Sequence, residues 1–371
     1  MTDQMRGPMV PGSARAVLAS GVEFLQPEEA VLKAMLAGWA AQQTSRCLSP
    51  VTMEKRGLTV QRFAAFTNDY PWRWSCADVE EWSTSMVAAG LSHATLRNYQ
   101  QTVALFVAYL CDLRYDWSDV CLERFGTHPT QVFHEGNMAV HRSETEGRPT
   151  NRPFSREEAL AFFAFCDERV AAAAHSGRKG WLAAYRDSVL FKVIYAWGLR
   201  RREAAMLDVS DWITNPAQPQ YGRFGAVAVR YGKASKGTPP KRRTVLTSMA
   251  WAAEAVAQWV NEIRPEYAAS NGPMLWPTER GQRITPSHLG ARFVAIRDAM
   301  GLAPELRPHC LRHSYVTHSL EDGADHLFIQ QQVGHAWGST TAIYTSVSSD
   351  YKNQALERAL RRAFEEEDTE R

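Results

Sequence analysis

Cysteine is scarce in this 371-residue sequence, and its six residues are widely dispersed. No two of them form a C-x-x-C pair; they are Cys47, Cys76, Cys111, Cys121, Cys166 and Cys310. Zinc ribbons and disulfide frameworks both depend on close, regular cysteine spacings. We therefore expect reduced thiols, most of them buried, and neither of these two scaffolds.

Long apolar runs are also missing. No run approaches the about 18 residues that a membrane helix needs. The N-terminal segment MTDQMRGPMVPGS lacks the charged-then-apolar order of a signal peptide. The apolar fraction of 45% is ordinary for a globular protein, and the length is typical of about two domains. These features predict a cytoplasmic protein.

The sequence also lacks a strong net charge of either sign. The net charge of +2 does not by itself indicate a nucleic-acid-binding protein, which is usually strongly basic. The basic residues are nevertheless clustered locally. The segment GKASKGTPPKRR at 232–243 holds five of them and no acidic residue. Charge alone favours a solvated loop.

The first part of the chain has a helical pattern. Glycines and prolines interrupt residues 1–26, which predicts a loosely ordered tail. Four stretches with apolar residues at helical spacing follow. The clearest begins after Ser92, a possible cap, and repeats apolar residues at steps of three and four over Leu96–Leu110. We predict a small helical domain over residues 27–120.

The periodicity disappears over residues 121–153, which predicts an interdomain linker. The second domain, 154–371, opens with a capping box formed by Ser155 and Glu158. Two β-like runs, GAVAVRY and RTVLT, flank the basic segment and predict a hairpin. Further helices are predicted at about 182–197, 249–263, 286–300, 309–321, 325–332 and 353–364. The predicted fold class is mainly α with a small antiparallel β-sheet, an α+β domain that follows a helical one.

Histidines cluster in the stretch HCLRHSYVTH at 309–318. His309 and His313 have the spacing of the two histidines in a zinc-protease helix. Such a helix has its glutamate base directly after the first histidine, where this sequence has Cys310. The guanidinium of Arg312, between the two imidazoles, would repel a dication. We therefore predict no metal site.

The same stretch fits an anion better. Pro308 is suited to the first turn of a helix. His309 and Arg312 would then lie on one face near the N-terminus, where free backbone N–H groups favour anions. Arginine can offer a phosphate two parallel hydrogen bonds. The pattern indicates a phosphate clamp, although a His-Arg pair also occurs by chance.

Three further stretches complete a larger pattern. GLRRREAAML places Arg200 after a helix end, and the basic hairpin carries Lys233 and Lys236. VGHAWGSTTAIYT places His335 nine residues before Tyr344. The order Arg, Lys, His-x-x-Arg, His, Tyr resembles that of the tyrosine recombinase (phage integrase) family. The resemblance covers almost the whole second domain. The first domain resembles the family's helical core-binding domain more loosely.

The resemblance implies a role for each matching position. The residues that would bind the scissile phosphate are Arg200, His309, Arg312 and His335. Glu203 matches a supporting acidic residue that orients its neighbours. Tyr344 would be the nucleophile and would form a 3′-phosphotyrosine with DNA. His313 and His318 are expected to be structural.

A lysine of the hairpin would act as the general acid on the departing 5′ oxygen. Counting along the strand AVRYGK favours Lys233, whereas counting backward from RRTV favours Lys236. The loop contains Pro239 and Pro240 and is longer than the family's usual turn, so both lysines stay candidates. Residues that could contact double-stranded DNA, or form a solvated face instead, are Lys55, Arg56, Arg62, Arg97, Asn98, Gln101, Lys241 and Arg242.

These features predict a site-specific DNA recombinase, such as the integrase of a mobile element, that needs no cofactor. If the resemblance holds, the active assembly is a tetramer on two DNA sites. A type IB-like topoisomerase and a telomere resolvase share the chemistry and are alternatives. A catalytically silent DNA-binding protein on the same scaffold is an alternative from another class. The last predicted helix, 353–364, would pack on its own domain or on a neighbouring protomer.

Overall fold

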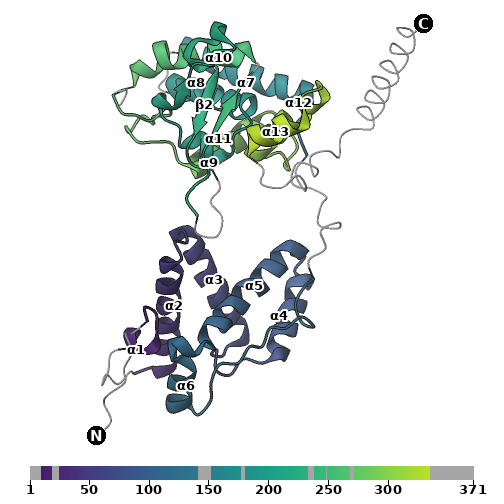
Figure 1. Ribbon diagram of the computed structural model, residues 1–371. Coiled ribbons are helices and arrows are strands. Elements are labelled where there is room, and N and C mark those ends of the chain that lie inside the picture. Colours follow the sequence, from purple (N-terminus) through teal and green to yellow (C-terminus); the bar gives the residue numbers. More distant parts are fainter. Residues whose placement is uncertain are drawn as a thin grey trace, which may run out of the picture. The chain divides into compact units, whose positions relative to one another are not determined.

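The structure is a computed structural model that describes residues 10–18, 25–140, 152–176, 180–232, 238–247, 249–267 and 271–334. The chain folds as two compact units. The first holds residues 10–140, and the second holds most of the described residues from 152 onward. Figure 1 shows both units.

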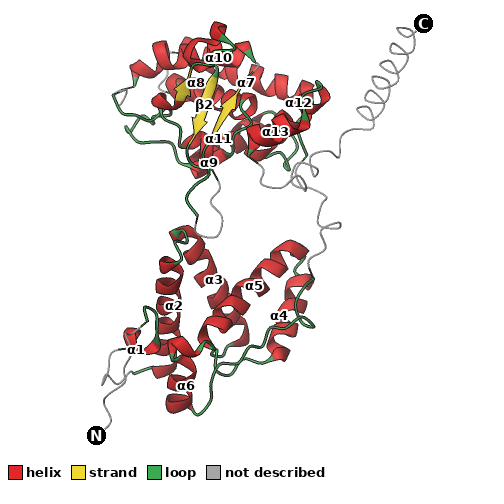
Figure 2. Cartoon of the chain, viewed as in Figure 1, coloured by secondary structure: helices red, strands yellow, loops and turns green. Residues whose placement is uncertain are grey.

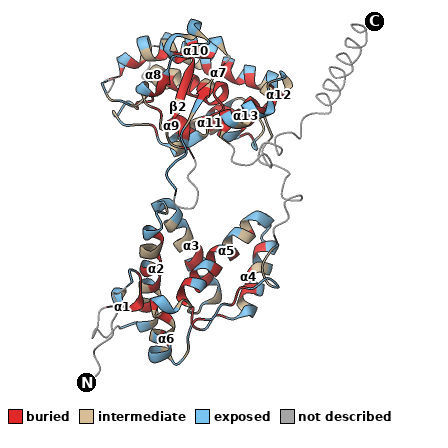
Figure 3. Ribbon diagram, in the orientation of Figure 1, coloured by how far each residue is buried: buried red, intermediate tan, exposed pale blue. Residues whose placement is uncertain are grey.

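The first unit consists of helices. Its elements are α1 (Ala14–Val17), α2 (Pro27–Ser45), α3 (Pro50–Thr67), α4 (Cys76–Ala88), α5 (His93–Leu110), η1 (Leu113–Tyr115) and α6 (Trp117–Phe125). Serine hydroxyls cap three of the helices, because the side chains of Ser49, Ser75 and Ser92 each accept a backbone N–H of the first turn. The predicted cap and helix at α5 are thus confirmed. α5 packs against α3 and α4, and its apolar stripe is buried (Figure 3).

The core of the first unit is aromatic. Phe63 lies at its centre, and its ring centroid is 4.7 Å from that of Trp74, 4.8 Å from that of Trp82 and 5.7 Å from that of Phe133. Ring pairs at these separations stabilise a core beyond the area that they bury. Phe133 belongs to the stretch that was predicted to be a linker, so the buried core of this unit reaches past residue 120.

Two boundaries in this unit differ from the prediction. α6 runs across residue 120, because Trp117 and Cys121 on it are fully buried in the core. The predicted tail contributes α1, and the carbonyl of Gly12 accepts hydrogen bonds from the Tyr109 hydroxyl and from Nε1 of Trp117. A nine-residue helix and a four-residue helix are too short to show clear periodicity in a sequence.

The second unit consists of helices and one small sheet (Figure 2). Its helical elements up to the sheet are α7 (Arg156–His175), α8 (Trp181–Ala196), α9 (Arg201–Ala205), η2 (Val209–Asp211) and η3 (Pro219–Phe224). Its strands are β1 (Trp212–Ile213), β2 (Ala226–Val229) and β3 (Arg243–Leu246). The later elements are α10 (Ala250–Gln258), η4 (Trp259–Ile263), η5 (Arg264–Glu266), α11 (Pro286–Ala299), α12 (Pro308–Glu321) and α13 (His326–Val333).

The three strands pair antiparallel in the order β1-β2-β3. Val227 on the central strand pairs with Trp212 on one side and with Val245 on the other. The predicted fold class, mainly α with a small antiparallel sheet, is therefore confirmed. β1 and α9 are too short to have been predicted from periodicity. The predicted helix at 249–263 changes at Trp259 into a π-helical turn.

α8 forms the middle of this unit. From Arg186 to its end α8 is buried except at Lys192, so this part has almost no solvated face, and the helix packs against α7, α10 and α12. Phe191 on α8 meets Phe162 of α7 and Phe293 of α11 at centroid distances of 5.6 Å each. α8 ends at Ala196, and α9 begins at Arg201 after four intervening residues that include Gly198.

Gly198 makes the turn between α8 and α9 possible. Its φ is +56°, and a Cβ at this position would lie 2.4 Å from Cδ1 of Tyr315 on α12. Both the left-handed backbone and the close ring require glycine. The turn therefore fixes where α9 starts relative to α12.

We predict that Gly198→Ala destabilises the protein more than Gly301→Ala does. Gly301 has a similar φ of +65° but has open space where its Cβ would be, so it reports the backbone cost alone. That cost is about 1–2 kcal/mol, and overpacking against Tyr315 should add about 1–3 kcal/mol. Urea unfolding of the two variants measures the difference. Equal midpoints would contradict the steric account of this turn.

Candidate active site

Four of the predicted site residues lie within the described chain and come together in the second unit. They are Arg200, Glu203, His309 and Arg312. The other predicted catalytic positions, Lys233, Lys236, His335 and Tyr344, lie outside the described residues. The described part of the site comes from α9, α12 and the elements that contact them.

Arg200 and Glu203 form one local unit at the start of α9. Arg200 is the residue before the first turn, and its backbone N–H donates to Oε2 of Glu203 at 2.8 Å. Its Nη1 donates to Oε1 of the same carboxylate, also at 2.8 Å. The Glu203 side chain is 1% exposed and the Arg200 side chain 26%. Glu203 thus holds an arginine that still reaches solvent, as the predicted supporting role requires.

Arg312 approaches the same carboxylate from α12. Its Nη1 lies 3.8 Å from Oε2 of Glu203 and donates to the carbonyl of Gly198 at 2.6 Å. Its Nη2 donates to the carbonyl of Val333, at the end of α13, at 2.5 Å. The side chain is fully buried, so in this state Arg312 connects three elements and acts on its neighbours through its charge.

A third arginine, which the sequence analysis did not single out, completes the cluster. Arg243 at the start of β3 makes a bidentate pair with Glu203, with Nη1 to Oε1 at 2.9 Å and Nη2 to Oε2 at 2.8 Å. Its Nε donates to the carbonyl of Gln332 on α13 at 2.7 Å. A signal was present in the sequence, because the two-residue period of a strand places Arg243 on the same face as the buried Val245.

Glu203 is ionised at neutral pH although it is buried. Burial alone would raise the pKa of its carboxyl. The hydrogen bonds and charge of Arg243, and then the charges of Arg200 and Arg312, outweigh burial and lower the pKa to about 2. Because the folded-state pKa lies below the ordinary value of 4.5, this carboxylate stabilises the fold above about pH 4.5. That stabilisation is lost as the pH falls toward 2.

His309 lies in the first turn of α12, directly after Pro308, as predicted. The residue is exposed, yet desolvation of the ring and the positive charges of Arg312, His313 and Arg200 lower its pKa to about 4. The imidazole is therefore neutral at pH 7 and can donate one hydrogen bond. A negative charge placed beside it would raise this pKa.

The other two histidines of the cluster are buried. His318 has clear structural partners, since its Nδ1 lies 2.9 Å from the Tyr195 hydroxyl and its Nε2 lies 3.0 Å from the carbonyl of Phe154. These contacts join α12 to α8 and to the segment before α7. Among the described residues, no group of three or more His, Cys, Asp or Glu side chains could hold a metal ion.

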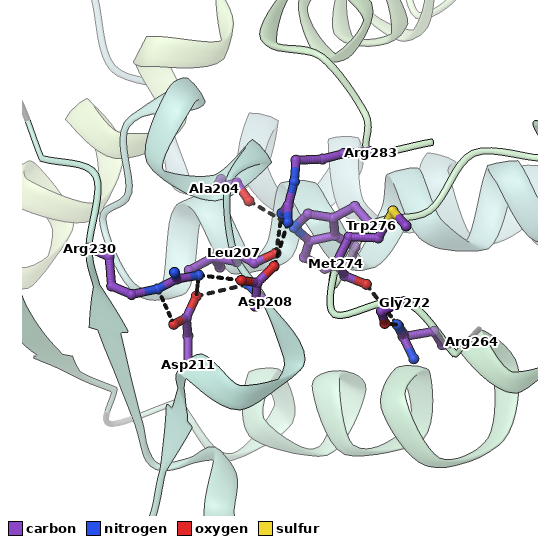
Figure 4. A network of polar contacts seen from close by, with 10 residues as sticks. All are labelled: Ala204, Leu207, Asp208, Asp211, Arg230, Arg264, Gly272, Met274, Trp276 and Arg283. Atoms are coloured by element: carbon purple, nitrogen blue, oxygen red, sulfur yellow. Dashed lines mark hydrogen bonds and ion pairs between the residues drawn. The ribbon is translucent and has the colours of Figure 1, made fainter. Parts of the chain in front are cut away.

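A second polar network fastens the segment that follows α9 (Figure 4). Asp208 accepts from Arg230, just after β2, and from Arg283, while Arg230 also pairs with both carboxylate oxygens of Asp211. Nη1 of Arg283 donates to the carbonyl of Leu207 at 2.8 Å. The network ties the end of α9 to the strand that leads into the basic hairpin.

The hairpin is described up to Gly232 and again from Thr238. The N–H of Gly232 donates to the carbonyl of Lys241 at 3.1 Å, so the two sides pair beyond the ends of the strands. Lys241 and Arg242 are exposed, as contact with DNA would require. Lys233 is the next residue along the chain from the paired Gly232, whereas Lys236 is four residues from it.

The predicted DNA-contacting residues of the first unit lie on α3 and α5. Lys55, Arg62, Asn98 and Gln101 are exposed, whereas Arg56 and Arg97 are half-buried; Nη1 of Arg56 donates to Gln43 at 2.9 Å. Nη1 of Arg62 on α3 donates to the hydroxyl of Tyr99 on α5 at 2.8 Å. The two helices thus present their basic and amide side chains next to each other, and contact with DNA stays a prediction.

Comparison with known proteins identifies the family. The model of the phage integrase family matches residues 157–350, which is more than half of the chain. The chain therefore belongs to the phage integrase family, and the predicted family of tyrosine recombinases is confirmed. Site-specific recombination of DNA, the predicted activity, is the activity of that family. No described helix is long and apolar enough to cross a membrane.

Individual relatives are similar over part of their length. Tyrosine recombinase XerC of Chromohalobacter salexigens is 29% identical over 248 residues, which cover 65% of this chain and 74% of that protein. Tyrosine recombinase XerC of Rhodospirillum centenum is 32% identical over 232 residues. The match covers 62% of this chain and 61% of that protein, so the chain spans less than two thirds of this relative.

A solved structure shows the same fold. It is that of XerH site-specific recombinase bound to palindromic difH substrate in a post-cleavage complex. Its TM-score is 0.62 at 21% identity, and the similarity covers 90% of this chain and 84% of that one. At this identity the likeness concerns the fold alone.

We predict that His309 titrates near pH 4 in the free protein and at a higher pH when an anion binds. The surrounding arginines disfavour the imidazolium, and a phosphate beside the ring would partly cancel their effect. NMR of protein with labelled histidine, with His309→Gln to assign the signal, measures both midpoints. His318, enclosed by Tyr195 and Phe154, should not respond to the anion. An unchanged His309 midpoint would contradict an anion site here.

Proposed function

We propose that this protein is a site-specific DNA recombinase that cleaves and rejoins DNA through a 3′-phosphotyrosine, for the integration or excision of a mobile element. The observation that carries the proposal is the convergence of Arg200, Arg312 and His309 around the ionised Glu203. Two segments far apart in the sequence, the start of α9 and the first turns of α12, build this cluster. Its charge is positive, and a phosphodiester is the anion that the family acts on.

The phosphate-binding residues fit the charge that develops during cleavage. A phosphodiester is negatively charged, and its transition state carries more charge on the non-bridging oxygens. Fixed cationic and N–H donors can stabilise that charge without reorganising during the reaction. Arg200 and His309 reach solvent and would contact the phosphate, whereas the predicted ligand Arg312 is fully buried with both Nη atoms on backbone carbonyls and would contribute its charge. Losing one such donor typically costs about 3 kcal/mol, or roughly 100-fold in rate.

The proposed chemical step transfers one phosphoryl group. The phenol oxygen of Tyr344 forms a bond to phosphorus, and the bond from phosphorus to the 5′ oxygen breaks. The phenol loses one proton and the departing 5′ oxygen gains one. Lys233 or Lys236 would donate the proton that the 5′ oxygen receives. The cationic surroundings would favour loss of the phenol proton, since the ordinary pKa of tyrosine is about 10. The reverse attack by a free 5′-hydroxyl rejoins the strands without ATP.

The proposal includes double-stranded DNA as the partner and a tetramer on two sites as the active assembly. The exposed basic residues of α3, α5 and the hairpin support DNA contact, because phosphate contacts supply affinity. We include a cytoplasmic location, where such DNA is accessible. A topoisomerase would share every chemical step but would relax supercoiled DNA and would not join two sites.

We predict that Tyr344→Phe abolishes covalent attachment to DNA. The test substrate is a duplex of the cognate site, taken from the DNA that flanks the gene, with a nick that lets the cleaved fragment diffuse away. Wild-type protein should form an adduct that survives denaturing electrophoresis. Tyr344→Phe removes only the attacking oxygen.

Tyr351→Phe is the matched control, because it removes a hydroxyl seven residues away and should leave the adduct intact. An adduct that persists in Tyr344→Phe would rule out this nucleophile. Absence of any adduct with the wild-type protein would favour the silent DNA-binding alternative. Joining of two sites, compared with relaxation of a plasmid, separates recombinase from topoisomerase.

A further inference from the structure

The cluster around Glu203 has a charge balance that the known roles do not explain. One carboxylate is surrounded by three guanidinium groups, those of Arg200, Arg243 and Arg312. The net charge of the four groups is +2. Arg200 and Arg312 are the predicted phosphate ligands, whereas Arg243 has no assigned function.

Arg243 is not arranged to bind the phosphate itself. Both of its Nη atoms donate to Glu203 and its Nε donates to the carbonyl of Gln332. Its side chain is 12% exposed, less than half the 26% of Arg200. A Cβ added at Gly334 would lie 3.0 Å from Cδ of Arg243, so the stem of the arginine runs close to this glycine. Every nitrogen of this guanidinium is engaged inside the protein.

Glu203 both helps and opposes phosphate binding. It orients Arg200 through two hydrogen bonds, which is a benefit. Its negative charge also lies beside the cations that must attract a phosphate, and in a largely buried cluster such charges are weakly screened. If Arg200 and Arg312 were its only partners, the carboxylate would cancel about half of their positive charge.

We propose that Arg243 is a positioning residue that offsets the charge of Glu203, so that Arg200 and Arg312 keep their full positive charge for the phosphate. The inference rests on the proposed function, because it concerns catalysis at the same phosphate. The bidentate contact supports it, because this pairing is the strongest that Glu203 makes. A cluster charge of +2 would then match the charge that accumulates on the phosphoryl group in the transition state.

A double-mutant comparison distinguishes a charge-balancing role of Arg243 from a purely geometric one. Arg243→Met leaves the Glu203 charge unbalanced and reduces the cluster to +1. We expect cleavage of the nicked duplex to slow by about 30-fold or more. Adding Glu203→Gln removes that charge and returns the cluster to +2. The Glu203→Gln/Arg243→Met protein should therefore cleave at least about tenfold faster than Arg243→Met alone.

Arg243→Lys provides the conservative variant. Lysine keeps the charge but loses the planar two-bond contact. We expect it to cleave within about fivefold of the wild-type rate, because charge is the property that matters here. Single-turnover cleavage at saturating protein, with DNA affinity measured separately, keeps loss of the chemical step distinct from loss of binding.

Arg292→Met is the matched control for removing a partly buried arginine. Arg292 of α11 pairs with the buried carboxylate of Asp187 on α8 and does not contact Glu203. It should lower the unfolding midpoint without slowing single-turnover cleavage. Thermal unfolding of every variant shows whether a slow protein is simply unfolded, and only folded variants are compared.

The inference is overturned if the double variant is as slow as Arg243→Met or slower, or if Arg243→Lys is as slow as Arg243→Met. Either result would mean that Arg243 acts through shape and hydrogen bonding alone. The adduct assay on the wild-type protein distinguishes failure of this inference from failure of the proposed function. If it forms the covalent adduct while the double variant shows no recovery, the recombinase proposal stands and only the charge-balancing role falls.

Discussion

The buried carboxylate of Glu203 is the interaction on which the rest of the site depends. A single ionised group without partners would be very costly to bury, and it is stable here because three arginines surround it. Those arginines come from α9, β3 and α12. Each would be repelled by the other two if the carboxylate were absent. The same pairing thus stabilises this region of the fold and assembles the positive charge.

Local contacts hold in place the elements that carry Glu203 and its arginine partners. Gly198 lies in the four-residue turn between α8 and α9 and lets the Tyr315 ring pack against that turn. Asp208 connects the end of α9 to Arg230 and Arg283 (Figure 4). Arg312 connects the α8–α9 turn to the end of α13. The functional residues are therefore fixed by several elements, as preorganised electrostatic catalysis requires.

The sequence predicted the long helices and the residue types of the site, and it could not predict how they meet. α5 and α12 have strong local signals, a serine cap at Ser92 and a first-turn proline at Pro308. The order of Arg200, His309 and Arg312 indicated the family, which the family match confirms. The strand pattern places Arg243 on the face of the buried Val245, but it does not reveal the partner Glu203, forty residues away. α6 and β1 were missed because short elements show little periodicity, and the full burial of Arg312 follows from packing alone.

The most direct test of the central claim is the crystal structure of Tyr344→Phe protein bound to DNA that carries its cognate site. The account predicts that the scissile phosphate lies within hydrogen-bond distance, about 3 Å, of the Arg200 guanidinium and the His309 imidazole. Glu203 should still accept from Arg200 and Arg243 in that complex. A phosphate bound in another part of the second unit, with Arg200 and His309 facing solvent, would contradict the account.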